Sequence, residues 1–383
     1  MHVLIHVLSS LFTLLLSGYF IYIIIHLISW SRLSMPEIPD SYTPKTKISV
    51  IIAARNEEAT IAKCIESIAV QTYPTYLLEI LVVDDHSMDK TKELAEKALA
   101  NISIPGKVIS NRERSHGKKS ALTEGIKNSN GELIVIIDAD CKSGPHWLTA
   151  LENEYRQSGA YMLCGPVQIV SETGLLGHFQ SLELCGLSLL SGAGINAGVP
   201  LLCNGANMAY TRKVFDDVGG FKGIDNNPSG DDILLMFKVN HKFPGKIRYV
   251  KSKDAFVSTS AQDSFRSFLL QRIRWASKGL YSKNFANSFV SMLVFSSNFL
   301  SILAIIISFA FARVFPLLLI GLILKVISDF LLLLFATAFF EKKKLLILFP
   351  IAELITMFYV SWVGVAANFS SYSWKDRHYK HPV

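Results

Sequence analysis

Four long apolar runs constrain this chain of 383 residues more than any other feature of its sequence. The first extends from about Val3 to Trp30 without Asp, Glu, Lys or Arg, and three more follow near residues 287–311, 314–339 and 345–368. Each run has about 20 residues or more, which is enough for a helix to cross a bilayer. The sequence therefore predicts a multi-pass membrane protein with a soluble middle.

The first run is interpreted as a retained transmembrane anchor, residues 1–31. It is longer than the roughly 7 to 15 residues of a signal-peptide core, and no small-residue cleavage site precedes the charged stretch after it. A signal sequence is the alternative. The other predicted parts are a soluble domain at 45–260, an amphipathic interfacial helix at 261–285, three membrane helices within 286–370 and a basic tail at 371–383.

Basic residues near the apolar runs predict the orientation of the chain in the membrane. They follow the first run, precede the second and separate the third from the fourth: Arg32, Lys45, Lys47, Arg266, Arg272, Arg274, Lys278, Lys283 and Lys342 to Lys344. All fall on one side if the soluble domain is cytoplasmic, as expected for a protein of the cell inner membrane. The basic tail at 374–380 breaks this pattern, because four crossings would place it on the opposite side. One run could therefore be re-entrant or interfacial, or the number of spans could be wrong by one.

The net charge of +7 is consistent with a basic collar that faces anionic lipid headgroups. Nucleic acid is not expected as a partner, because no basic stripe is interleaved with aromatic residues. The five cysteines form no close pair of metal-binding or redox type: Cys64, Cys141, Cys164, Cys185 and Cys203. They are predicted to be small buried side chains in a reducing compartment.

The soluble domain alternates strand and helix patterns. Strands are expected at Ile48–Ala53, Glu79–Val83, near Val108 and at Leu133–Ile137, and helices at Glu57–Ala69, Thr91–Ala100 and Ser120–Asn128. This order predicts an α/β fold whose parallel sheet is covered on both faces.

Polar residues follow three of these strands. They are Arg55, Asn56 and Glu57 after the first, Asp84 to Ser87 after the second, and Asp138-Ala139-Asp140 after the fourth. Ligands of such sheets bind beyond the carboxyl ends of the strands, so these residues are expected to share one crevice. Helix capping and turn formation are the alternative role for residues of these types.

Two carboxylates at the end of a buried strand are costly unless a cation compensates them. No GxGxxG and no GxxxxGK[ST] pattern follows a strand, so neither a dinucleotide fingerprint nor a P-loop accounts for the crevice. Asp138 and Asp140 instead fit a site where Mg²⁺ or Mn²⁺ bridges a pyrophosphate, because these ions prefer carboxylate and phosphate oxygens. The metal would act as a Lewis acid on a departing nucleoside diphosphate.

An ordered set of motifs covers about residues 47–279. It comprises residues 47–58 (KISVIIAARNEE), 81–91 (LVVDDHSMDKT), 116–122 (HGKKSAL), 137–140 (IDAD), 203–210 (CNGANMAY), 219–221 (GGF), 230–232 (GDD) and 271–275 (QRIRW). Each motif is weak alone, but the set resembles the family 2 glycosyltransferases of GT-A fold, in particular the membrane-bound members that carry a QxxRW motif.

The resemblance implies a role for each matching residue. Ala53, Arg55 and Glu57 would border the nucleoside, Asp85 would accept a hydrogen bond from the base, usually uracil, and Lys118 would lie near the phosphates. Asp138 would contact ribose or metal, Asp140 would be the direct metal ligand, and Asp232 would be the catalytic base. Gln271 and Arg274 would lie near the diphosphate, with Trp275 and Asn207 on the acceptor side.

Two departures from the family pattern bear on these roles. The first loop lacks the proline and tyrosine of many members, so a guanidinium contact would replace stacking on the base. The motif Gly230-Asp231-Asp232 leaves Asp231 as the alternative base, although register favours Asp232. A carboxylate base is required in any case, because a sugar hydroxyl is a poor nucleophile at neutral pH. Both aspartates also stand where they could begin a helix over 233–239.

Residues 264–281 mix apolar side chains with Arg266, Arg272, Arg274 and Lys278, as in an amphipathic helix lying on a membrane. We expect this helix both to lie at the membrane and to serve the site. Inside the later apolar runs, Lys325, Asp329 and Glu353 are ionisable residues at a costly depth. An ion pair between Lys325 and Asp329 across one helical turn is one interpretation. The other is a cavity for a lipid headgroup or sugar.

The resemblance thus implies a metal-dependent, inverting hexosyltransferase at the membrane, with a nucleotide sugar as donor, most simply a UDP-sugar. A membrane lipid, a lipid-linked glycan or a cell-envelope polysaccharide would be the acceptor. A processive synthase of the poly-N-acetylglucosamine, hyaluronan or cellulose type is the alternative. A catalytically silent nucleotide-sugar-binding or transport protein is the third hypothesis.

Overall fold

The computed structural model describes residues 2–39, 41–111, 117–225, 229–280, 284–310, 315–368, 372–374 and 377–379. The chain forms two compact units. The sheet unit comprises residues 33–172 and 190–261, and the helical unit comprises residues 1–32, 173–189 and 262–383. Residues 173–189 lie inside the predicted soluble segment in sequence but belong to the helical unit.

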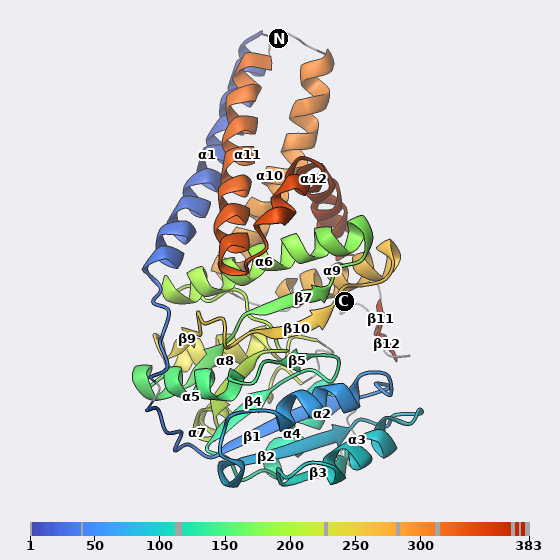
Figure 1. The fold of residues 1–383 in the computed structure, drawn as a ribbon. Helices are drawn as coiled ribbons and strands as arrows, with labels where there is room; N and C mark the ends of the chain where they lie inside the picture. Colours follow the sequence, from blue (N-terminus) through green and yellow to red (C-terminus); the bar gives the residue numbers. More distant parts are fainter. Residues whose placement is uncertain are drawn as a thin grey trace. The chain divides into compact units, whose positions relative to one another are not determined.

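The sheet unit is built on a seven-stranded sheet with the strand order β3-β2-β1-β4-β8-β6-β9 (Figure 1). The strands are β1 (Ile48–Ala54), β2 (Leu78–Asp84), β3 (Gly106–Ser110), β4 (Leu133–Ile136), β6 (Met162–Cys164), β8 (Met208–Thr211) and β9 (Ile247–Tyr249). The first four strands pair in parallel, whereas β8 is antiparallel to both β4 and β6. The predicted mostly parallel sheet is therefore confirmed, with an antiparallel insertion. β1 is apolar except for Ser49 and almost wholly buried, as expected of a central strand covered on both faces.

Helices and a smaller sheet complete this unit. The helices are α2 (Ile61–Ala69), α3 (Thr91–Ala100), α4 (Lys118–Lys127), α5 (Trp147–Ser158), α7 (Arg212–Asp217), α8 (Ile233–Lys242) and the 3₁₀ turn η1 (Thr75–Leu77); the smaller sheet has the order β5 (Lys142–Ser143), β10 (Val257–Ser260) and β7 (Val167–Ser171). The helix predicted from Glu57 begins at Ile61, because residues 57–60 form a turn whose carbonyl at Glu57 accepts from Thr60 and Ile61.

The helical unit holds four helices long and apolar enough to cross a membrane: Ser9–Arg32, Phe285–Ser308, Leu318–Phe339 and Lys343–Ala366. They belong to α1 (His2–Arg32), α10 (Phe285–Ala310), α11 (Phe315–Phe339), and the 3₁₀ helix η3 (Lys343–Leu348) with α12 (Phe349–Ala366). The unit also contains most of α6 (Gly174–Asn196), α9 (Phe265–Leu280), and the antiparallel ribbon of β11 (Tyr372–Trp374) and β12 (Arg377–Tyr379). The four predicted runs thus form helices that are long and apolar enough to cross a membrane. Lys283 and much of the basic tail lie outside the described residues.

A buried polar cluster joins three of these candidate spans. Lys325 on α11 has no exposed surface, and its Nζ lies 3.0 Å from Asp329 Oδ2 and contacts the Glu353 carboxylate on α12. Tyr19 on α1 donates a hydrogen bond of 2.5 Å to Asp329. The predicted ion pair across one helical turn is therefore present, and Glu353 and Tyr19 extend it to two other helices.

We expect Lys325→Met to destabilise the protein strongly. The substitution leaves Asp329 and Glu353 as buried carboxylates without their ammonium partner, and breaking a buried ion pair in this way typically costs about 3–5 kcal/mol. Thermal unfolding of the detergent-solubilised protein measures the loss, and Ser328→Ala, at a neighbouring buried position on α11, is the matched control. If Lys325→Met combined with Asp329→Leu kept full activity and stability, a functional cavity at this cluster would be excluded.

Candidate active site

The segments that follow β1 and β2 are linked by hydrogen bonds. Arg55 Nη1 donates to the carbonyl oxygens of Asp85 and His86, both at 2.8 Å. The Asn56 backbone N–H donates to Ser87 Oγ at 3.1 Å, and Asn56 Oδ1 accepts from the Met88 N–H at 2.9 Å. The two predicted clusters of polar residues therefore lie together beyond the carboxyl ends of these neighbouring parallel strands. In this structure the Arg55 guanidinium holds the second loop in place.

Asp85 connects this edge of the sheet to α4. The residue is buried, its Oδ1 accepts from Asn111 Nδ2 at 2.9 Å, and its Oδ2 accepts from the Gly117 N–H at 3.1 Å. Asn111 in turn accepts from Ser120 Oγ at 3.0 Å. The sequence analysis missed Asn111, although it follows β3 as the other polar residues follow their strands. The predicted contact of Asp85 with a base stays a prediction.

The centre of the site is an ion-pair cluster around Lys118, the first residue of α4. Its Nζ lies 2.6 Å from Asp138 Oδ1, beyond the end of β4, and 3.0 Å from Asp231 Oδ2, in the loop before α8. Burial by itself would lower the pKa of Lys118, but the two carboxylates outweigh burial and raise that pKa well above its usual value. The tertiary structure thus brings together residues that are 20 and 113 positions from Lys118 in sequence.

Asp232 is the N-cap of α8. Its Oδ1 accepts from the Ile233 N–H at 2.8 Å and its Oδ2 accepts from the Gly205 N–H at 3.3 Å. The predicted helix start after Asp232 is confirmed, so capping is a real role of this residue. The turn before it needs a glycine, because Gly230 has φ of +83° and a Cβ there would stand 2.9 Å from Leu234.

Asp138 and Asp140 present hard oxygen ligands of the kind that Mg²⁺ and Mn²⁺ take. Asp140 is exposed, while Asp138 is partly exposed and paired with Lys118. Among the described residues, no three His, Cys, Asp or Glu side chains are gathered closely enough to hold an ion by themselves. The residues fit a metal that completes its coordination shell with phosphate oxygens and water, as these ions do at nucleotide sites.

Two of the cysteines flank this strand end as buried thiols. Cys64 Sγ lies 3.6 Å from the Asp138 carbonyl oxygen, and Cys141 Sγ lies 3.3 Å from Asp140 Oδ1. Burial, and then the carboxylates of Asp140 and Asp138, raise the pKa of both thiols above the usual value. All five cysteines are free; four of them are buried as predicted, whereas the prediction is wrong for Cys203, which is partly exposed.

Lys119 is a second residue that the sequence analysis missed. It is buried, and its Nζ donates to the carbonyl oxygens of Ile224 at 2.6 Å and Ser229 at 2.9 Å. The two neighbouring lysines of α4 therefore both bind the segment that precedes α8. Lys118 contacts the side chain of Asp231, and Lys119 contacts the backbone just before it. The motif at 116–122 contained this residue, but nothing in the spacing distinguished the two lysines.

Asn207 has a structural role within the sheet unit, and its predicted acceptor-side role stays a prediction. Its side chain is fully buried, accepts from Trp147 Nε1 at 3.0 Å, and donates to the carbonyl oxygens of Pro166 and Ala255, both at 2.8 Å. A Cβ at Gly165 would stand within 2.3 Å of the Asn207 amide, so the carboxamide fills its space completely. Its hydrogen-bonding groups hold three segments of the sheet unit together.

Gln271, Arg274 and Trp275 lie on α9 in the helical unit, so their predicted roles near the diphosphate and the acceptor stay predictions. The predicted helix is confirmed. Arg272, one of the basic residues of the predicted membrane-surface helix, is instead buried and donates from Nε to both oxygens of Glu183 at 2.9 and 3.0 Å. Its guanidinium lies 4.2 Å from the ring centroid of Trp275. Arg272 is therefore a packing residue of the helical unit and does not face lipid headgroups.

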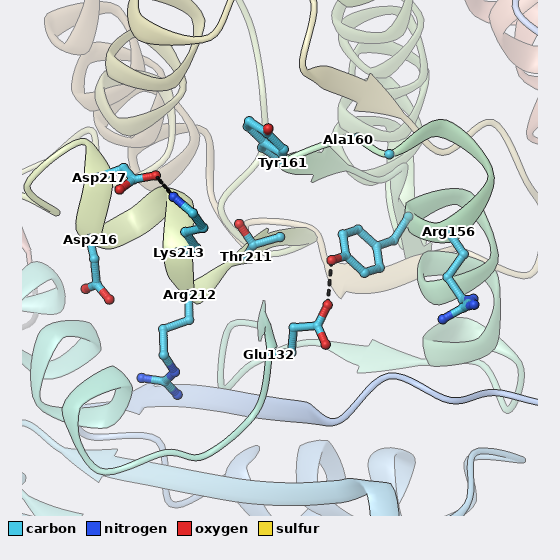
Figure 2. A pocket seen from close by; sticks show the side chains of 11 residues that line it. Glu132, Arg156, Ala160, Tyr161, Thr211, Arg212, Lys213, Asp216 and Asp217 are labelled. Carbon is cyan, nitrogen blue, oxygen red and sulfur yellow. Dashed lines mark hydrogen bonds and ion pairs between the residues drawn. The ribbon is translucent and has the colours of Figure 1, made fainter.

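A cavity of about 860 Å³ lies elsewhere in the sheet unit. Glu132, Lys213 and Asp217 are among its lining residues, and Figure 2 shows that several of its charged and polar side chains bond to one another. Tyr155 donates to Glu132 at 2.6 Å, and Lys213 pairs with Asp217 at 2.8 Å. Because Glu132 precedes β4 whereas Asp138 follows it, this cavity opens at the opposite edge of the sheet from the ion-pair cluster. It is not the predicted nucleotide site.

Comparison with known proteins agrees with this geometry. Residues 49–219 match the model of the family described as Glycosyl transferase family 2. The chain is 26% identical over 262 residues to a probable glycosyltransferase, YdaM, of Bacillus subtilis, and 25% identical over 236 residues to the poly-beta-1,6-N-acetyl-D-glucosamine synthase of Staphylococcus epidermidis. These alignments cover 67% and 61% of this chain but 60% and 54% of the relatives' own length.

A solved structure shows the same fold. The mannosyltransferase PcManGT from Pyrobaculum calidifontis, solved in complex with GDP-Man and Mn²⁺, superposes with a TM-score of 0.58 at 18% identity, over 94% of this chain and 99% of that chain. The chain thus contains a domain, residues 49–219, that matches the Glycosyl transferase family 2 model, and the superposition supports a GT-A-like fold.

Proposed function

We propose that this protein is a membrane-bound, inverting glycosyltransferase that transfers a sugar from a nucleotide sugar to an acceptor in or at the membrane. The observation that carries the proposal is the cluster of Lys118, Asp138 and Asp231 beyond the carboxyl ends of the parallel strands. It places a mostly covered cation and several carboxylates where sheets of this kind bind their ligands.

In the proposed reaction the acceptor hydroxyl attacks the anomeric carbon as the bond to the diphosphate breaks, so one displacement inverts the anomeric centre. Asp232 takes the hydroxyl proton, and Asp231 is the alternative base. The Lys118 ammonium offsets the negative charge that grows on the departing diphosphate. Asp138 and Asp140 would hold a divalent cation, which supplies Lewis-acid stabilisation of the same leaving group.

The donor-side roles rest on the loops after β1 and β2. Ala53, Arg55 and Glu57 would border the nucleoside, and Asp85 would contact the base. Arg55 already donates two hydrogen bonds to the second loop, so we propose that it shapes the nucleoside pocket in addition to contacting the ligand. The family resemblance favours a UDP-sugar. Because the superposed mannosyltransferase holds GDP-Man, both nucleotides belong in the test.

The acceptor is proposed to be a membrane lipid, a lipid-linked glycan or a cell-envelope polysaccharide, and the domain to face the cytoplasm from the inner membrane. Four candidate spans and the basic residues Arg32, Lys45 and Lys47 beside the first of them support this placement. A processive polysaccharide synthase is the second candidate function. It is favoured by the similarity to the Staphylococcus epidermidis synthase.

The test uses purified full-length protein in detergent or nanodiscs with Mn²⁺ or Mg²⁺, a panel of UDP- and GDP-sugars, and a lipid extract as acceptor. We expect nucleoside diphosphate release with one donor, dependent on the extract, and a lipid product heavier by one sugar. Products longer than a few sugars would favour the processive synthase. Donor binding without any diphosphate release would instead favour a silent binding protein.

A further inference from the structure

We propose that Lys118 competes with the divalent cation for Asp138, so that the cation binds tightly only together with the diphosphate of the donor. This inference rests on the proposed function, because it assumes that Asp138 and Asp140 form the metal site. The proposed property is that the site binds the metal-nucleotide complex in preference to the bare ion, which the family resemblance does not imply.

In this structure Lys118 pairs with a carboxylate that the proposed metal would also use. Lys118 Nζ is 2.6 Å from Asp138 Oδ1, a short charge-assisted contact. The Lys118 side chain is 18% exposed and that of Asp231 is 10% exposed, whereas Asp138 is 35% exposed, so an incoming ligand can reach Asp138 from solvent while the ammonium is mostly covered. A bare cation approaching Asp138 would therefore meet an ammonium, and would have to displace it.

The surroundings of Lys118 hold its ammonium in this position. The N–H of Gly117, at the start of α4, donates to Asp85, which fixes where the helix begins. Gly205 leaves the space that the cluster needs, because a Cβ there would stand 3.2 Å from both Lys118 Nζ and Asp231 Oδ2. The lysine is thus a built part of the site and not a surface side chain that happens to lie near a carboxylate.

A diphosphate weakens the competition between Lys118 and the cation for Asp138, because its oxygens can accept from Lys118 instead. Lys118 could then exchange Asp138 for a phosphate oxygen and keep an anionic partner on each side, while Asp231 remains within its reach. Removal of the ammonium from Asp138 lets the cation bind there. The cation and the diphosphate should therefore bind with positive coupling, and by linkage each raises the affinity of the other by the same factor.

The test measures Mn²⁺ affinity of the full-length protein by titration calorimetry, with and without UDP, and separately with GDP. Lys118→Gln removes the charge, Lys118→Met is a second neutral variant, and Lys118→Arg keeps the charge. Lys107→Gln, at an exposed lysine on β3, is the control for net charge. Without nucleotide, we expect the neutral variants to bind Mn²⁺ about tenfold more tightly than wild type, whereas Lys118→Arg and Lys107→Gln stay within about threefold.

With nucleotide, the coupling between Mn²⁺ and the diphosphate should fall in the neutral variants by about tenfold or more. Equal Mn²⁺ affinity in wild type and both neutral variants would overturn the competition while leaving the metal site in place. Equal tightening in Lys118→Arg would overturn it as well, since charge would not be the cause. If wild type bound no Mn²⁺ even with UDP or GDP, the proposed metal site itself would be wrong, and this inference with it.

Discussion

Asp232→Asn is expected to lower sugar transfer by about 100-fold or more while leaving the protein folded. Loss of a general base typically costs about 10² to 10⁴ in rate. Asn can keep the cap of α8, because Asn caps helices about as well as Asp, but its amide nitrogen cannot accept from the Gly205 N–H as Asp232 Oδ2 does. The expected loss of stability is about 1–3 kcal/mol, mainly because the buried Gly205 N–H loses its acceptor. Nucleoside diphosphate release and thermal unfolding measure the two effects.

Asp231→Asn separates the two candidate bases. Asp231 pairs with Lys118, so its substitution should weaken donor binding and lower the thermal stability. Activity of Asp232→Asn within about threefold of wild type would show that Asp232 is not the base. A large loss of maximal rate in Asp231→Asn with unchanged donor affinity would then transfer the assignment to Asp231.

Asp140→Asn is expected to abolish transfer to a similar extent, for a different reason. As a proposed metal ligand, Asp140 supports several kcal/mol of charge stabilisation on the leaving diphosphate. A loss of about 3 kcal/mol corresponds to more than about 100-fold in rate. Because Asp140 is exposed, its neutral isostere should leave the thermal unfolding temperature unchanged. The variant should also bind Mn²⁺ more weakly in the presence of UDP or GDP.

The control for this substitution is Glu66→Gln, which removes the charge of an exposed carboxylate on α2. It should keep wild-type activity and metal affinity. If Asp140→Asn retained transfer within about threefold and bound Mn²⁺ like wild type, Asp140 would not be a metal ligand, since loss of even an outer-shell partner typically costs about tenfold or more.

Several elements could be predicted because their physical cause is local. Thr91–Ala100 is helical at both predicted ends, and the apolar strands β1, β2 and β4 lie where continuous hydrophobic runs indicated buried parallel strands. The four candidate spans follow from length and hydropathy alone. Local patterns could not show that β8 inserts antiparallel beside β4, since the strand order depends on packing between segments far apart in sequence.

The candidate site likewise has features that local sequence determined and features that depend on tertiary packing. The sequence by itself determined which residue types stand at the strand ends, because a parallel α/β sheet places the polar groups after its strands at one edge. Only the tertiary structure decided which of these groups pair. Lys118 pairs with Asp138 and Asp231, and Asn207 is buried and bonded to the backbone of a distant segment. Arg272, predicted on a membrane-surface helix, forms an ion pair with Glu183. The physical reason is that a side chain's partner depends on three-dimensional distance and on the burial of its charge, and residue spacing along the chain encodes neither.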